Sequence, residues 1–131
     1  MMMMKSKLPA DTILIVEDDV FISMDAADSV SRAGVNVVTA ETVHDALDIL
    51  ENEEISAAIL DFHVRDGAVT PIVDELRRKG IPFRIVSGSP LAEIAANGIP
   101  TGFCAQKPAD YVKVLVSLIS ERPWTALRPN I

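Results

Sequence analysis

Short runs of apolar residues recur five times along the chain, and longer segments with helical spacing separate them. Most runs are apolar on consecutive positions and do not alternate with polar residues, so each strand is expected to be buried on both faces, as in a parallel sheet covered by helices. The predicted strands are Thr12–Val16, Val35–Thr39, Ile55–Leu60, Pro82–Ser87 and Gly102–Gln106. This alternation predicts a right-handed, doubly wound α/β fold with a five-stranded parallel sheet and helices on both faces.

The segments between the strands carry the start and stop signals of helices. Thr42 and Asp110 are typical N-caps, and Gly34 and Gly80 stand where a left-handed residue ends a helix. The predicted helices are Val20–Ala33, Thr42–Glu53, Ala68–Lys79, Leu91–Ala96 and Asp110–Glu121. The fourth is expected to be short, because two prolines and two glycines fall within residues 88–101.

Apolar spacing also predicts which helix faces are buried. In the second helix the buried stripe is expected to contain Val43, Ala46, Leu47 and Leu50, and in the last helix Val112, Leu115, Val116 and Ile119. Phe21 and Met24 of the first helix are expected in the core. The following tail, "PWTALRPNI", is expected to form an extended arm or a frayed end, with Trp124 packing back on the domain as an alternative.

Length and charge restrict the class of protein. With 131 residues the chain is expected to form one domain over residues 11–121, with an extension at 1–10 and a tail at 122–131. The net charge is −7, and no basic stretch is denser than Arg77–Lys79, which argues against nucleic-acid binding. The single cysteine, Cys104, excludes an internal disulfide and favours the cytoplasm. No stretch is apolar for long enough to predict export or a membrane span.

Polar residues follow four of the predicted strands directly. In open α/β sheets, ligands bind beyond the carboxyl ends of the strands, so these side chains are expected to meet at one edge. They are Glu17, Asp18 and Asp19 after the first strand, Asp61 after the third, Ser87 at the end of the fourth and Lys107 after the fifth. The arrangement predicts a site, although each residue has an ordinary alternative as a helix cap, a turn former or a solvated charge.

Clustered carboxylates without thiols or a histidine pair suit a hard cation, Mg²⁺ or Mn²⁺, bound together with phosphate oxygens. Asp61 beside such a metal can act as a nucleophile toward phosphorus. Lys107 and the Ser87 hydroxyl can stabilise the remaining phosphoryl oxygens. Asp19 is the acid most readily explained as a helix cap.

These residues resemble the receiver domains of two-component response regulators, which are CheY-like. The resemblance covers roughly Thr12–Ser120 and depends on "ILIVEDD", "AAILD" with the later "DG", "VSG" and "KP", in that order. It implies a flavodoxin-like strand order of 2-1-3-4-5. It also implies that Ser87 follows the phosphoryl group and that Lys107 is the cation of the site.

The same resemblance implies the roles of the acids. Asp61 would be the phosphoacceptor and would also touch the metal. Asp18 would bind the metal directly and Glu17 through water, and the backbone carbonyl of His63 would be a further ligand.

Several positions depart from the receiver pattern or could modulate it. Arg65 stands where many members have proline. The aromatic switch residue usually lies three positions before the lysine, where this chain has Cys104, with Phe103 one position earlier. The side chains of His63, Arg65 and Ser89 are further candidate modulators. The sparse fourth helix resembles a subgroup of single-domain receivers in which that helix is flexible.

The predicted function is that of a stand-alone receiver, not an enzyme. Asp61 would take a phosphoryl group from a histidine kinase or a histidine phosphotransfer protein, and the signal would leave through a protein partner. A homodimer through the face of the fourth helix, fifth strand and fifth helix is an open alternative. Two other functions are weighed: a haloacid-dehalogenase-type phosphatase or phosphotransferase, which would need D-x-D where this chain has E-D-D-V, and an unphosphorylated pseudo-receiver.

Overall fold

Five parallel strands form the central sheet of the computed structural model, which describes residues 11–120. They are β1 (Thr12–Val16), β2 (Asn36–Ala40), β3 (Ala57–Leu60), β6 (Phe83–Ser87) and β7 (Cys104–Gln106). Their order is β2-β1-β3-β6-β7, which is 2-1-3-4-5 among the strands of this sheet and confirms the predicted fold. The predicted extension at residues 1–10, the tail at 122–131 and Glu121 lie outside the described residues.

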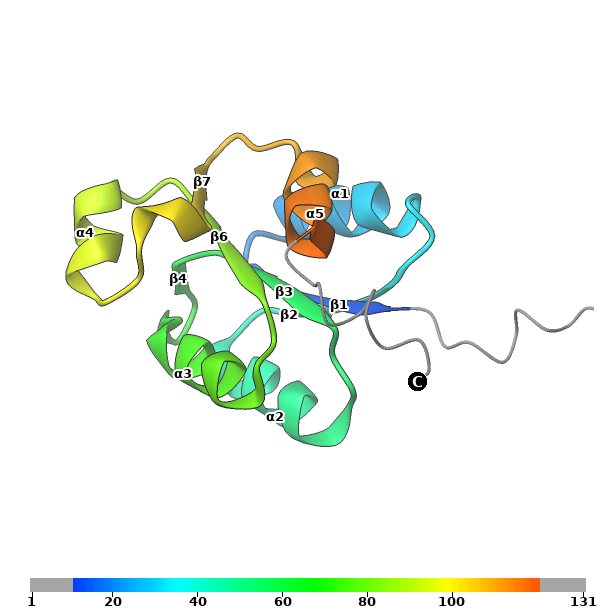
Figure 1. The fold of residues 1–131 in the computed structure, drawn as a ribbon, viewed down its shortest axis with the longest axis horizontal. Helices are drawn as coiled ribbons and strands as arrows, with labels where there is room; N and C mark the ends of the chain where they lie inside the picture. The colour runs from blue at the N-terminus through cyan, green and yellow to red at the C-terminus, as the bar shows by residue number, and fades with distance from the viewer. Residues whose placement is uncertain (1–10, 121–131) are drawn as a thin grey trace, which may run out of the picture.

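Five α-helices surround this sheet (Figure 1). They are α1 (Val20–Ser31), α2 (Val43–Asn52), α3 (Thr70–Lys79), α4 (Leu91–Ala96) and α5 (Tyr111–Ser120). Helices α1 and α5 cover one face of the sheet, and α2 and α3 cover the other. Every predicted helix is present. Within the described residues, no observed helix end differs from its predicted position by more than two residues.

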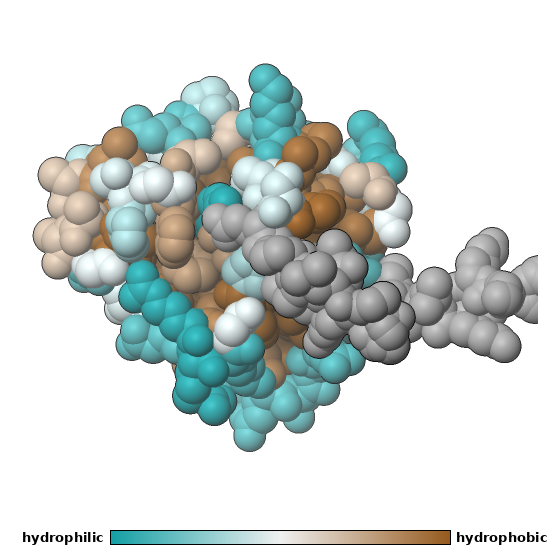
Figure 2. Space-filling model, viewed as in Figure 1, coloured by the Kyte–Doolittle hydropathy of each residue, from teal (hydrophilic) through white to brown (hydrophobic). Residues whose placement is uncertain are grey.

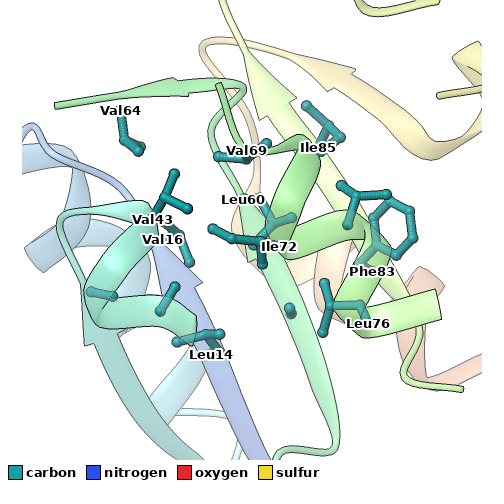
Figure 3. Packing of buried hydrophobic residues seen from close by; sticks show 14 of the residues in the cluster. Leu14, Val16, Val43, Leu60, Val64, Val69, Ile72, Leu76, Phe83 and Ile85 are labelled. Atoms are coloured by element: carbon teal, nitrogen blue, oxygen red, sulfur yellow. The ribbon is translucent and has the colours of Figure 1, made fainter. Parts of the chain in front are cut away.

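The sheet separates two hydrophobic layers, and β1 contributes to both. Leu14 and Val16 point toward α2 and α3, whereas Ile13 and Ile15 point toward α1 and α5. Figure 3 shows the first layer, in which Leu60 of β3 lies among side chains from the helices and neighbouring strands. Burial on both faces explains why the strands are apolar on consecutive positions.

The predicted capping residues lie at the starts and ends of the helices, as expected. Thr42 Oγ1 accepts a hydrogen bond of 3.0 Å from the amide of Asp45, and Asp110 Oδ1 accepts two from the first turn of α5. Gly80 has φ +71° after α3, and Gly34 has φ +93° after α1. Both values lie in the left-handed region that favours glycine.

The predicted buried face of α5 was wrong at three of its four residues, since only Leu115 among them is buried. The buried residues are Tyr111, Val114, Leu115 and Leu118, while Val112, Val116 and Ile119 are exposed. Seven of the ten positions of α5 are apolar or aromatic, so helical spacing fits more than one face and cannot select between them. Phe21 and Met24 are likewise exposed on α1 and not in the core, because Ser23, Ala26 and Val30 form its buried face.

Two short elements were not predicted. The loop after β3 contains an antiparallel hairpin of β4 (His63–Val64) and β5 (Gly67–Ala68), and a 3₁₀ helix (Thr101–Phe103) replaces the first two positions of the predicted fifth strand. A two-residue strand is too short to show periodicity. Among the described residues, no helix is both long enough and apolar enough to cross a membrane.

Candidate functional site

The acidic cluster forms because β1 and β3 are neighbours in the sheet. Val16 and Leu60 are partners in the register, and the amide of Asp61 donates a hydrogen bond of 2.9 Å to the carbonyl of Val16. The strands therefore end side by side. One carboxylate oxygen each from Glu17, Asp18 and Asp61 lies within 4.8 Å of the others, so the structure brings the three acids together as predicted.

Lys107 reaches this cluster from the end of β7. Its Nζ lies 2.8 Å from Oε1 of Glu17 and 3.0 Å from Oδ2 of Asp61. Its own amide donates to the carbonyl of Ser87, 3.1 Å away, which keeps the end of β7 beside the end of β6. One ammonium group thus bridges two carboxylates on separate strands.

Burial sets the electrostatics of the pair formed by Glu17 and Lys107. Glu17 is only 4% exposed, and this burial raises the pKa of its carboxyl group, although hydrogen bonds from Lys107 and the Asp19 amide oppose the shift. Burial lowers the pKa of Lys107, but hydrogen bonds to Glu17 and Asp61 outweigh it, so that pKa is raised overall. The cluster holds three carboxylates and one ammonium group, which leaves a formal negative excess that a cation would offset.

Asp19 does not belong to this set of acids. Its Oδ1 accepts hydrogen bonds of 2.9 and 3.1 Å from the amides of Phe21 and Ile22, so it caps α1. Its backbone amide donates to Oε2 of Glu17 over 3.0 Å and helps to hold that carboxylate in place.

Asp61 has a different partner for each oxygen. Oδ1 accepts a hydrogen bond of 2.7 Å from the amide of Phe62, and Oδ2 accepts one from Lys107. His63, two residues further on, turns its imidazole toward α4: its Nε2 lies 2.8 Å from Oε2 of Glu93, and its ring packs edge-on against Phe62. The His63 side chain therefore connects the loop after Asp61 to α4.

Ser87 ends β6 and is buried. Because Leu60 pairs with Ile85 in the register, Ser87 stands one position further along its strand than Asp61 does along β3. Its Oγ accepts a hydrogen bond of 3.0 Å from the amide of Ser89, and the carbonyl of Ser89 accepts one of 3.3 Å from the side chain of Gln106. The Ser87 hydroxyl therefore lies at the same edge of the sheet as the acids.

The hairpin after Asp61 is also attached to α2. Arg65 pairs with Glu41, 2.8 Å away, so its guanidinium is engaged beyond the end of β2. Asp66, which the sequence pattern includes only as part of "DG", accepts hydrogen bonds from the amides of Val43 and His44 over 2.6 and 3.1 Å. The bond from Val43 is the main reason why the pKa of Asp66 is lowered. No local pattern signals this cap, because more than twenty residues separate the two segments.

The two candidates for the switch position lie beside β6. The Phe103 ring packs edge-on against Phe83, with centroids 5.2 Å apart, and the Arg84 guanidinium lies 5.7 Å from the Phe103 centroid. Cys104 begins β7 and is partly buried, which raises the pKa of its thiol. Phe103 is thus the aromatic residue at this end of β7. It lies one position before Cys104, which occupies the position where the family pattern predicts an aromatic residue.

Comparisons with known proteins identify the fold. No family model and no curated protein matches the chain. A CheY-like response regulator receiver domain protein from Methanospirillum hungatei JF-1 is similar in structure, with a TM-score of 0.78, 23% identity and coverage of 89% of this chain and 97% of that chain. A response regulator receiver protein from Sinorhizobium medicae WSM419 has a TM-score of 0.76 and 21% identity, covering 85% and 93%.

A third similar structure is longer than this chain. The response regulator PhyR from Brucella abortus has a TM-score of 0.74 and 29% identity, and the match covers 89% of this chain but only 51% of that protein. The chain therefore has the fold of a response regulator receiver domain, and the predicted resemblance is confirmed. The roles of the individual site residues remain predictions.

Proposed function

We propose that the chain is a phospho-receiver in which Asp61 accepts a phosphoryl group from a phosphohistidine on a histidine kinase or a histidine phosphotransfer protein. The observation that carries this proposal is the cluster at the strand ends. Glu17, Asp18 and Asp61 place carboxylate oxygens within 4.8 Å of one another, and Lys107 lies 3.0 Å from Asp61. The receiver fold of the similar structures supports the same reading.

The donor set fits a hard divalent cation. Glu17, Asp18 and Asp61 supply carboxylates, and the backbone carbonyl of His63 would supply a further oxygen, with Glu17 acting through water. Such ligands suit Mg²⁺ or Mn²⁺, which keep several waters and accept phosphate oxygens. When bound, the ion would neutralise negative charge on the phosphoryl group.

The transfer needs a nucleophile and a neutralised phosphoryl group. One Oδ atom of Asp61 attacks the phosphorus, the P–N bond of the donor phosphohistidine breaks, and the departing nitrogen keeps the electron pair. Lys107 donates a hydrogen bond to Oδ2 of Asp61 in the structure. After transfer, its ammonium group would donate to a phosphoryl oxygen instead. The product is an acyl phosphate on Asp61, which the chain would form and lose without acting as an enzyme on other substrates.

The signal would start at Ser87. A phosphoryl oxygen on Asp61 can accept a hydrogen bond from the Ser87 hydroxyl, and drawing Ser87 inward would change the segment that leads to α4. The surface of α4, β7 and α5, with Phe103 or Cys104 at the switch position, would then present a different face to a protein partner. A homodimer through this surface remains an alternative way to use it.

A phosphoryl mimic tests the proposal. Beryllofluoride with Mg²⁺ is expected to shift the amide NMR signals of Asp61, Ser87 and Lys107, and Asp61→Asn is expected to abolish these shifts. Asp74→Asn, which removes an exposed aspartate from α3, is the matched control and should respond like the natural chain. Unchanged spectra in the natural chain would refute the proposal, and sustained turnover of a phosphate ester would instead identify a phosphatase.

A further inference from the structure

The hairpin that follows Asp61 is too small to be stable by itself. Strands β4 and β5 have two residues each, and His63 pairs with Ala68 and Val64 with Gly67. An isolated two-stranded hairpin is marginally stable at best in water. The conformation of this hairpin therefore depends on its contacts with the rest of the domain.

The hairpin contacts two helices. Val64 is buried in the same hydrophobic layer as Val43, the first residue of α2 (Figure 3). The side chain of His63 reaches α4 instead, where its Nε2 lies 2.8 Å from Oε2 of Glu93. Along the chain, the backbone carbonyl of His63 therefore lies between an attachment to α4 and the attachments to α2.

The tip of the hairpin caps the start of α2. The first amides of an α-helix have no partner within the helix. In α2 the amides of Val43 and His44 donate to separate carboxylate oxygens of Asp66, over 2.6 and 3.1 Å. The next amide, that of Asp45, donates to Oγ1 of Thr42. The start of α2 is thus capped twice, once by the residue before the helix and once by the hairpin.

Helix α2 is a firm attachment point because its inner face is packed against the sheet. Val43, Ala46 and Leu50 are buried in the layer on that side. Figure 2 shows mainly hydrophilic surface along α2 and α3, as expected for helices whose opposite faces are exposed to water. A side chain that binds the first turn of α2 is therefore fixed relative to the strands that end at the site.

The neighbouring ion pair is the weaker attachment. Arg65 lies 2.8 Å from Glu41, but both side chains are more than half exposed. Exposed pairs of this kind contribute little to stability. The two hydrogen bonds to Asp66 are therefore the main contact between the tip of the hairpin and α2.

We propose that Asp66 is a positioning residue for the cation site. By holding the hairpin against α2, it keeps the backbone carbonyl of His63, three residues earlier, in place as a ligand. Groups that hold a ligand in place without touching the metal affect metal affinity strongly. The inference rests on the proposed function, which assigns the His63 carbonyl to the cation.

Mn²⁺ binding tests the inference, because the electron paramagnetic resonance signal of the free ion measures affinity without any phosphoryl transfer. Asp66→Ala is expected to raise the dissociation constant for Mn²⁺ about tenfold relative to the natural chain. Asp66→Asn removes the charge but keeps one oxygen that can accept from the amides of α2. Its dissociation constant is therefore expected to lie between the other two values. Circular dichroism verifies that each variant is folded.

Thr42→Ala is the matched control. It removes the other cap from the same end of α2 and does not touch either bond to Asp66. The loss of a cap lowers stability, so this variant shares any general loosening of α2. It should nevertheless bind Mn²⁺ as tightly as the natural chain.

Three results would overturn the inference alone. Equal affinity of the natural chain and Asp66→Ala would show that the hairpin does not position a ligand. An Asp66→Asn chain as weak as Asp66→Ala would show that only the charge matters, and equal weakening by Thr42→Ala would show that only the stability of α2 does.

The remaining outcomes also decide. If Asp66→Ala does not fold, Asp66→Asn replaces it, and a constant equal to that of the natural chain would overturn the inference. A natural chain that binds no Mn²⁺ would instead overturn the proposed function, and this inference with it.

Discussion

Replacement of Lys107 by methionine tests how the site is neutralised without metal. The substitution keeps most of the side-chain volume and removes the ammonium group that lies 2.8 Å from Glu17 and 3.0 Å from Asp61. Glu17 is only 4% exposed, so its carboxylate would be left buried without its cation. The folded state should therefore lose stability.

The size of the loss follows from the distances and from the ordinary pKa of glutamate. At an effective dielectric constant near 20, each of these ion pairs is worth about 5–6 kcal/mol before desolvation is counted. Glu17 can escape part of the loss by binding a proton. Protonating a carboxyl group with the ordinary pKa of 4.5 at pH 7 costs about 3 kcal/mol. This cost is therefore the upper limit of the destabilisation that Glu17 contributes. We expect Lys107→Met to lower the free energy of unfolding at pH 7 by about 3 kcal/mol.

The pH dependence has a definite sign. The folded pKa of Glu17 lies above its unfolded value, and the substitution raises it further. Between these two pKa values the folded state binds more protons than the unfolded state, so stability falls as pH rises. At pH 5 the loss caused by Lys107→Met should therefore shrink to about 1 kcal/mol.

Urea unfolding followed by circular dichroism, in buffer with a chelator at pH 7 and pH 5, measures these values. Lys113→Met, which removes an exposed lysine from α5, is the control and should change stability by less than about 0.5 kcal/mol. Added Mg²⁺ should restore part of the stability of the Lys107 variant, because the ion supplies the missing positive charge. A loss below about 0.5 kcal/mol at pH 7, or one that is equal at both pH values, would show that Lys107 does not neutralise Glu17.

Three further substitutions test other parts of the structure. Leu60→Ala opens a cavity in the layer below α2 and α3 and should cost about 2–5 kcal/mol in urea unfolding; a cost below about 1 kcal/mol would contradict the packing. Asp66→Ala removes the side chain that caps the amide of Val43. Because the folded pKa of Asp66 is lowered, the natural chain loses stability as pH falls below the ordinary carboxyl range, and the variant should lose less. Parallel curves of melting temperature against pH for the two proteins would argue against the cap. Glu93→Gln weakens the exposed contact with His63. Amide hydrogen exchange in α4 should therefore become faster, while the free energy of unfolding changes by less than about 1 kcal/mol. Unchanged exchange would mean that the pair does not stabilise α4.

Much of the fold could be predicted because its strands are buried on both faces. Consecutive apolar residues gave the bounds of β1 as Thr12–Val16, and the two prolines and two glycines within residues 88–101 gave those of α4 as Leu91–Ala96. The site could be predicted for a related reason. Parallel strands end at one edge, so the polar residue after each strand is brought near the others wherever the strands are neighbours.

The remaining features depend on contacts that are distant in sequence. In α5 the apolar residues outnumber those that the sheet can cover, so only packing decides that Leu115 is buried and Val116 exposed. The cap of α2 by Asp66 joins segments with no shared local pattern. The hairpin that carries His63 is likewise too short to leave a periodic signal.

The most direct test of the central claim is chemical trapping of the modified residue. The chain is incubated with a small-molecule phosphodonor and Mg²⁺, reduced with borohydride, which converts an aspartyl phosphate to homoserine, and analysed by peptide mass spectrometry. The account predicts homoserine at position 61 alone, dependent on the metal and lost when Glu17 and Asp18 are replaced together by Gln and Asn. Modification at another carboxylate, or none at Asp61 in a protein shown to be folded, would contradict it.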